Sequence, residues 1–123
     1  RMDATRRLLL VEDDPLLRMT LAEALTEAGF TVIEAADAES ALGLVASRDD
    51  FDLLLTDINL PGADGFALAS AARRLRPGLP VVYASGRLSE ADPQRALPGA
   101  PFLAKPFTLS SALTTLQGAL GYS

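Results

Sequence analysis

The sequence contains no cysteine and no histidine among its 123 residues. Without cysteine it cannot form disulfides, thiolate zinc sites or a thiol nucleophile. Without histidine it cannot contain a Ser-His-Asp triad, an imidazole metal ligand or a phosphohistidine of its own. Its apolar runs are at most four or five residues long. Such runs are too short for a transmembrane helix or a signal peptide, so a cytoplasmic protein without membrane contact is expected.

Aromatic and basic residues are also few. Aromatics make up 6% of the chain, tryptophan is absent, and the formal net charge is −5. Because the basic residues fall mostly singly or in pairs, the sequence argues against nucleic-acid binding. The hydrophobic fraction of 49% is high enough for a folded core. We expect one domain over residues 1–123, with its core at about 6–121.

Short apolar runs alternate with amphipathic segments along the chain. The pattern predicts strands at 6–11, 30–35, 51–57, 79–85 and 101–105, and helices at 14–29, 37–50, 65–78 and 108–121. The first helix has its own boundary signals, with Asp14 as N-cap, Pro15 at the first helical position and Gly29 just past the end. Leucines recur at helical spacing, and we expect Leu17 on the apolar stripe of the first helix and Leu109 facing the core from the last.

Strands separated by helices indicate an α/β fold with a five-stranded parallel sheet that is covered by helices on both faces. The segment 87–100 is the weakest part of this pattern. It contains Pro93 and Pro98, and proline interrupts helix interiors. A fourth helix, between the last two strands, is therefore expected to be short or irregular.

Polar side chains follow four of the predicted strands. Glu12 and Asp13 come after the first strand, Asp57 ends the third, Ser85 ends the fourth and Lys105 ends the fifth. In an open parallel sheet, ligands bind beyond the carboxyl ends of the strands. The sequence therefore predicts that these side chains converge on one site.

The charges of this set suggest its chemistry. If Glu12, Asp13 and Asp57 come within about 5 Å, each pair repels by ~3 kcal/mol at an effective dielectric constant near 20. Oxygen ligands without histidine or cysteine favour a hard ion, Mg²⁺ rather than Zn²⁺. Lys105 adds a positive point charge suited to a phosphoryl oxygen, and Ser85 adds a neutral donor. Together these groups suit the transfer of a phosphoryl group.

Four stretches of the sequence carry a family resemblance: LLVEDDP (9–15), LLLTDINLPGADG (53–65), LPVVYASG (79–86) and FLAKPF (102–107). In combination they resemble the receiver domain of two-component response regulators, of the chemotaxis-regulator type, and the likeness spans essentially the whole chain. The resemblance implies a flavodoxin-like receiver fold with strand order 2-1-3-4-5.

The resemblance also implies roles for the site residues. Asp57 matches the phosphoacceptor, whose carboxylate takes a phosphoryl group from a phosphohistidine on a partner protein. Asp13 matches the direct Mg²⁺ ligand and Glu12 the acid that usually holds the ion through water. Asp57 itself and the backbone carbonyl of Asn59 complete the expected metal site. Lys105 matches the family's catalytic lysine.

Two further positions match the family's conformational switch. Ser85 corresponds to the hydroxyl residue that is drawn toward the phosphoryl group, and Phe102 to the aromatic residue that swings inward with it. The peptide bond between Lys105 and Pro106 is normally cis in this setting. Gly65 matches a glycine that is nearly fixed in the family.

The implied function is a signalling phosphoacceptor rather than an enzyme, with a sensor histidine kinase or a histidine phosphotransfer protein as donor and a downstream protein as target. It can be a monomer or a phosphorylation-dependent dimer, and a stand-alone regulator or part of a longer protein. One alternative is a degenerate receiver that acts only as an interaction module. Another is a haloacid-dehalogenase-type aspartyl-phosphate hydrolase, which would need a second Asp where this chain has Asn59.

Overall fold

Strands and helices alternate along the chain, as the sequence predicts. The computed structural model describes residues 5–47 and 50–121, so the predicted continuation of the second helix over 48–49 lies outside the described residues. The elements are β1 (Arg7–Val11), α1 (Pro15–Glu27), β2 (Thr31–Ala35), α2 (Ala38–Ser47), β3 (Leu53–Asp57), α3 (Gly65–Leu75), β4 (Val81–Ser85), a 3₁₀ turn (Leu88–Glu90), β5 (Phe102–Ala104) and α4 (Leu109–Ala119).

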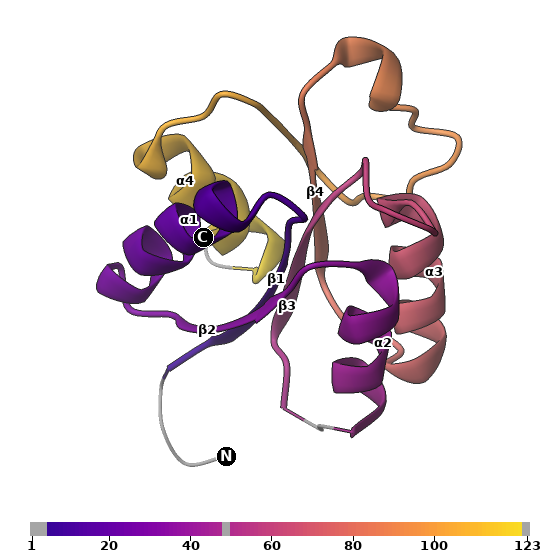
Figure 1. Cartoon of the computed structure of the whole chain (residues 1–123), viewed down its shortest axis with the longest axis horizontal. Coiled ribbons are helices and arrows are strands. Elements are labelled where there is room, and N and C mark those ends of the chain that lie inside the picture. The colour runs from indigo at the N-terminus through magenta and orange to yellow at the C-terminus, as the bar shows by residue number, and fades with distance from the viewer. Residues whose placement is uncertain (1–4, 48–49, 122–123) are drawn as a thin grey trace.

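The sheet has five strands in the order β2-β1-β3-β4-β5, which confirms the order that the family resemblance implies. All neighbouring strands are parallel, and Leu8 of β1 pairs with Val32 on one side and Leu53 on the other. Helices α1 and α4 cover one face of the sheet, while α2 and α3 cover the other (Figure 1). This is the predicted α/β architecture, and it brings the carboxyl ends of the strands to one edge.

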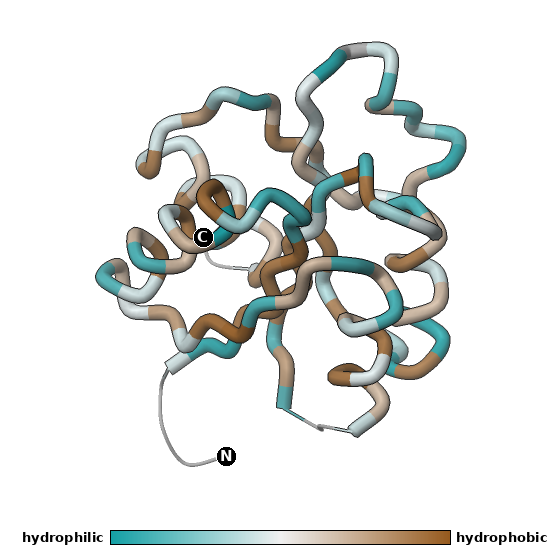
Figure 2. The backbone as a smooth tube through the Cα atoms, in the orientation of Figure 1, coloured by the Kyte–Doolittle hydropathy of each residue, from teal (hydrophilic) through white to brown (hydrophobic). Residues whose placement is uncertain are grey.

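The core forms one apolar cluster on each face of the sheet, because successive side chains of a strand point to opposite faces. Leu8 and Leu10 of β1 belong to the cluster under α1 and α4. Leu9 and Val11 belong to the cluster under α2 and α3. Figure 2 shows the same arrangement, with the central strands apolar and many of the connecting loops polar.

The ends of α1 lie where the sequence places them. The Asp14 side chain accepts hydrogen bonds from the amides of Leu16 and Leu17, at 3.0 and 3.2 Å. Gly29 follows the helix with φ of +109°, a conformation that favours glycine. The predicted orientation of Leu109 is wrong, because its side chain is 42% exposed, and Leu17 is 53% exposed. Both line a surface groove between α1 and α4.

The segment between β4 and β5 contains a 3₁₀ turn over Leu88–Glu90, followed by turns and bends over 91–101. The expectation of a short or irregular fourth helix, based on Pro93 and Pro98, is confirmed. Ala96, Leu97 and Ala100 pack against the core cluster beneath α2 and α3. The segment is therefore part of the packed structure of the domain.

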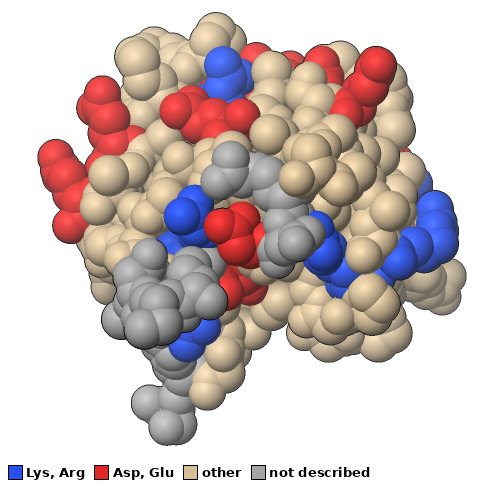
Figure 3. Space-filling model, turned by 90° about the horizontal axis from the view of Figure 1, so that it is seen from below, with Lys and Arg blue, Asp and Glu red and all other residues tan. Residues whose placement is uncertain are grey.

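The opposite end of the sheet carries Arg7, whose amide donates to Asp52 at 2.8 Å. Seen from this side, acidic and basic side chains are interspersed among uncharged ones (Figure 3). Among the described residues, no helix is long and apolar enough to cross a membrane.

Candidate functional site

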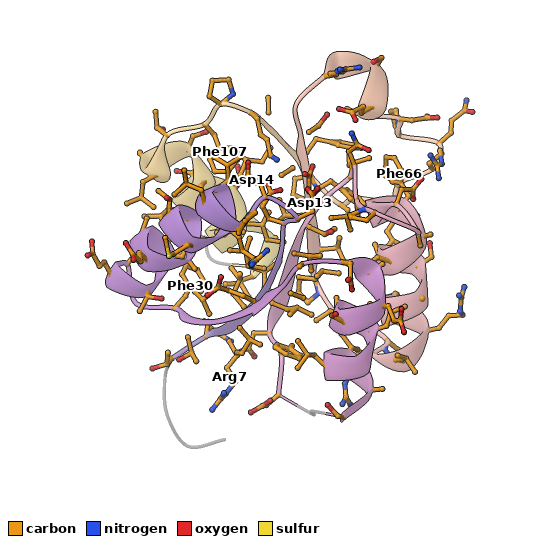
Figure 4. All side chains as sticks on the ribbon, in the orientation of Figure 1. Arg7, Asp13, Asp14, Phe30, Phe66 and Phe107 are labelled. Carbon is orange, nitrogen blue, oxygen red and sulfur yellow. The ribbon has the colours of Figure 1, made fainter. Side chains whose placement is uncertain are left out.

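The predicted site residues do meet at the carboxyl ends of the strands. Glu12 follows β1, Asp57 ends β3, Ser85 ends β4 and Lys105 follows β5. In Figure 4, Asp13 lies where β1 turns toward α1, at the end of the strand opposite Arg7. The parallel sheet thus converts positions far apart in the sequence into neighbours.

Three carboxylates form the acidic part of the site. One oxygen each from Glu12, Asp13 and Asp57 lies within 4.8 Å of the others. Glu12 is buried, Asp57 is largely buried and Asp13 is exposed. The amide of Glu12 donates to the carbonyl of Ala35 at 3.1 Å, which extends the hydrogen bonding between β1 and β2 by one residue. The acidic pair, Glu12 and Asp13, therefore follows directly from the hydrogen-bonded sheet.

Lys105 connects two of these carboxylates. Its Nζ donates to Glu12 Oε1 at 2.8 Å and to Asp57 Oδ2 at 3.1 Å. Its backbone N–H donates to the carbonyl of Ser85 at 2.8 Å, which joins the end of β5 to the end of β4. The bond between Lys105 and Pro106 is cis, as the family resemblance implies.

Burial and charge act in opposite directions on the ionisation of these groups. Burial raises the pKa of Asp57 above its ordinary 3.8, against the attraction of Lys105. Burial also opposes ionisation of Glu12, but hydrogen bonds from Lys105 and the Asp14 amide outweigh it and lower the pKa of Glu12 below 4.5. Burial likewise disfavours the charged form of Lys105, yet its bond to Glu12 and the charge of Asp57 raise its pKa above 10.5. At neutral pH the ammonium therefore remains charged between the two carboxylates.

The backbone around Asp57 is closely packed. Its carbonyl accepts a hydrogen bond from the Thr56 hydroxyl at 2.9 Å. The amide of Gly65 donates to the carbonyl of Ile58 at 2.7 Å, which ties the start of α3 to the end of β3. A Cβ atom on Gly65 would lie 2.3 Å from the Asp57 carbonyl oxygen, so only glycine fits here without a shift of the backbone.

The donor set fits a hard divalent ion, because Glu12, Asp13 and Asp57 offer carboxylate oxygens from one small region. Asn59 is exposed, and its backbone N–H favours the charged form of the Asp57 carboxylate, which acts to lower the pKa of Asp57. These are the residues that could hold Mg²⁺, with water completing the octahedron that this ion requires.

Of the two predicted switch residues, Ser85 ends β4 and Phe102 begins the neighbouring strand β5. The buried Ser85 hydroxyl donates to the carbonyl of Arg87 at 2.6 Å. Phe102 is partly buried, and its ring stacks on Tyr83 with the centroids 5.3 Å apart and the planes at 28°. Phe66 packs on both rings, at 5.0 Å from Tyr83 and 6.3 Å from Phe102. Phe102 thus belongs to an aromatic cluster of three rings.

Sequence reasoning missed the contacts that hold the segment 91–101 over this cluster. Arg95 pairs with Asp64 at 2.6 Å, and its guanidinium carbon lies 4.7 Å from the centroid of the Phe66 ring. The amide of Leu97 donates to the Tyr83 hydroxyl at 3.1 Å. Elsewhere in the site, Arg18 of α1 donates from Nη1 to the backbone carbonyl of Glu12 at 2.8 Å. Nothing in the local sequence signals these contacts, because the partners belong to different elements and lie 6 to 31 residues apart.

The family model described as the response regulator receiver domain matches residues 8–117. The chain is 38% identical over 113 residues to the transcriptional regulatory protein TcrA of Mycobacterium tuberculosis, which covers 90% of this chain and 44% of TcrA. The chain therefore spans less than half the length of that curated relative.

Two solved receiver structures have a similar fold. The receiver protein of Sinorhizobium medicae superposes with a TM-score of 0.89 at 29% identity, covering 96% of both chains. The receiver domain of the hybrid histidine kinase CckA gives a TM-score of 0.80 at 33% identity, covering 93% of this chain and 98% of that one. With the family match over residues 8–117, these likenesses establish that the chain belongs to the response regulator receiver domain family.

Proposed function

We propose that Asp57 accepts a phosphoryl group from a phosphohistidine of a sensor histidine kinase or a histidine phosphotransfer protein. The observation that carries this proposal is the position of the Asp57 carboxylate, which lies at the tip of β3 with Lys105 Nζ 3.1 Å away and two further acids within 4.8 Å. A single nucleophilic carboxylate beside a fixed cation and an acidic metal site is the arrangement that phosphoryl transfer requires.

In the transfer, a carboxylate oxygen of Asp57 forms a bond to phosphorus while the bond from phosphorus to the donor imidazole nitrogen breaks. The electron pair of that bond stays on the nitrogen. Lys105, already within hydrogen-bond distance of Asp57, neutralises charge on the phosphoryl oxygens once they are attached. Glu12, Asp13, Asp57 and the carbonyl of Asn59 would hold Mg²⁺. When bound, the ion supplies positive charge to the same oxygens.

A groove beside the site supports a protein as the donor. It has a volume of about 580 Å³ and is lined mostly by apolar surface of α1, of the loop before α4 and of Leu109, and Lys105 is one of its lining residues. Leu17 and Leu109, both in its lining, are 53% and 42% exposed. An apolar helix face that carries the phosphohistidine could bury these side chains and deliver the phosphoryl group next to Lys105.

The same groove gives a test of the donor. Leu17→Asp should leave labelling by acetyl phosphate unchanged but slow transfer from a phosphorylated histidine kinase by about tenfold, which corresponds to ~1.4 kcal/mol. Leu75→Asp is the matched control, because Leu75 is 49% exposed at the far end of α3. Equal slowing of kinase transfer in both variants would argue against docking at the groove.

We further propose that phosphorylation drives a switch through Ser85 and Phe102 toward a downstream protein target. The Ser85 hydroxyl would leave the Arg87 carbonyl, its present acceptor at 2.6 Å, and donate to a phosphoryl oxygen. The stack of Phe102 on Tyr83 would then rearrange, because β4 carries both Ser85 and Tyr83. Amide exchange over residues 83–104 should change when beryllium trifluoride is added as a phosphoryl mimic. Identical amide exchange with and without the mimic would refute this part of the proposal.

The direct test of function is the intact mass of the protein after incubation with acetyl phosphate and Mg²⁺. We expect a gain of one phosphoryl group that disappears without Mg²⁺ and in Asp57→Asn. Asp64→Asn is the control for a nearby carboxylate, because asparagine can still cap α3. Absence of labelling with bound Mg²⁺ would favour an interaction module, and continuous turnover of phosphoesters would favour a hydrolase.

A further inference from the structure

Arg18 is a partly buried arginine that contacts the backbone of the acidic pair. It belongs to α1, and its Nη1 donates to the backbone carbonyl of Glu12 at 2.8 Å. Its Nε pairs with Glu34 Oε1 of β2 at 3.3 Å, and its side chain is 20% exposed. One guanidinium thus joins α1, the end of β1 and the neighbouring strand β2.

The carbonyl of Glu12 needs such a partner because the sheet ends beside it. The last paired residues of β1 and β2 are Val11 and Ala35, and the Glu12 amide still donates to the Ala35 carbonyl. Beyond Ala35 the chain turns away into α2, so β2 presents no further strand amide to Glu12. Arg18 provides the missing donor, and its planar fork can satisfy the carbonyl and Glu34 together.

This contact fixes the peptide that carries both acids. Glu12 Oε1 reaches Lys105 at 2.8 Å, and Glu12 Oε2 accepts the amide of Asp14 at 3.1 Å. The amide of Arg18 donates to the Asp14 carbonyl at 2.9 Å, so the guanidinium and the first turn of α1 hold the acidic pair from two sides. A rotation of the peptide between Glu12 and Asp13 would displace both carboxylates at the same time.

We propose that Arg18 is a positioning residue for the metal site, which sets the backbone of Glu12 and Asp13 so that their carboxylates and that of Asp57 meet around one divalent ion. The inference rests on the proposed function, since it concerns the ion used in phosphoryl transfer. Arg18 acts through the Glu12 carbonyl and not on the reacting atoms. Outer contacts of this kind are known to affect metal affinity strongly.

The sign of the effect distinguishes positioning from simple charge. By Coulomb's law, removal of a nearby positive charge should strengthen the binding of a cation. If Arg18 positions the acids, its removal should instead weaken binding. For Arg18→Met we expect the Kd for Mg²⁺, measured by calorimetry without a phosphodonor, to rise about tenfold. The Mg²⁺ concentration for half-maximal labelling should rise by the same factor, while the rate at saturating Mg²⁺ changes less than about twofold.

Arg73→Met is a matched control. Arg73, on α3, is also partly buried and donates from Nε to the backbone carbonyl of Leu79 at 2.8 Å. This contact is near the amino end of β4, at the opposite end of the strand from Ser85. Its loss should leave the Kd for Mg²⁺ unchanged. Arg18→Lys keeps the charge and a donor, and it should recover part of the lost affinity.

An unchanged or lower Kd in Arg18→Met would overturn the proposal, and so would an equal rise of the Kd in Arg73→Met. If Arg18→Met does not fold, Arg18→Ala removes the same guanidinium with the residue of highest helix propensity and should raise the Kd in the same direction. An unchanged Kd in that variant would also refute the role of Arg18. Wild-type protein that binds Mg²⁺ but is never labelled would refute the proposed function alone, because the Kd comparison still decides the role of Arg18.

Discussion

The close approach of Gly65 to the Asp57 backbone predicts a large effect from the smallest possible substitution. In Gly65→Ala, the new Cβ would lie 2.3 Å from the Asp57 carbonyl oxygen and 2.8 Å from the Ile58 Cα. Both are backbone atoms, so no side chain can rotate away to make room. Either the start of α3 or the end of β3 must move, and the bond from the Gly65 amide to the Ile58 carbonyl, now 2.7 Å, must lengthen.

The magnitude follows from three contributions to the free energy of unfolding. Overpacking of a rigid site costs about 1–3 kcal/mol. Loss of the backbone hydrogen bond costs about 1 kcal/mol. Alanine recovers roughly 0.5–1 kcal/mol over glycine within a helix. The balance is a destabilisation of about 2 kcal/mol, or a fall in Tm of roughly 8 °C for a domain of this size.

The assay is thermal unfolding followed by far-ultraviolet circular dichroism, beside acetyl phosphate labelling. The matched control is Gly43→Ala in α2, where no atom lies within 4 Å of the added Cβ. This control should gain roughly 0.5–1 kcal/mol, so the two Gly-to-Ala changes should have opposite signs. We also expect slower labelling in Gly65→Ala, because the Asp57 backbone shifts. A Gly65→Ala protein as stable as wild type would refute the reasoning.

Three further predictions concern the segment that covers the aromatic cluster. Asp64→Ala removes the cap on the Ala67 amide and should cost about 1 kcal/mol at pH 7. Burial opposes ionisation of Asp64, but Ala67 and Arg95 lower its pKa below 3.8. The destabilisation by Asp64→Ala, measured by urea unfolding, should therefore be greatest at pH values above 3.8. It should disappear as the pH falls through the lowered pKa that Asp64 has in the folded protein. Arg95→Met should change stability by at most about 1 kcal/mol but speed amide exchange at Leu97; unchanged exchange would contradict a holding role. Tyr83→Phe leaves the Leu97 amide without its acceptor and should lower stability by about 1 kcal/mol in urea unfolding, whereas wild-type stability would show that this bond contributes nothing.

The elements of the fold were predictable because their signals are local. Apolar runs of four residues or so mark the strands, and Asp14 and Gly29 mark the ends of α1 by capping chemistry that involves only neighbouring residues. The order of the strands is a different matter, because no local pattern states that β1 lies between β2 and β3. That order came from the family resemblance.

The site was predictable to the extent that a parallel sheet aligns the ends of its strands. Glu12, Asp57 and Lys105 meet for that reason. The contacts of Arg18 and Arg95 were not predictable, because their partners lie on other elements, 31 residues away in the pair of Arg95 with Asp64. Helical periodicity failed at the exposed Leu109 in the same way, since it identifies an apolar stripe but not whether another element covers it.

The bond between Lys105 and Glu12 joins residues 93 positions apart, and the bond between Lys105 and Asp57 spans 48. During synthesis, Glu12 and Asp57 therefore emerge well before the lysine that completes their site. Until β5 has docked at the edge of the sheet, the acids face each other without that ammonium. An intact site is thus a late event in the formation of the domain, and labelling at Asp57 would report the folding of almost the entire chain.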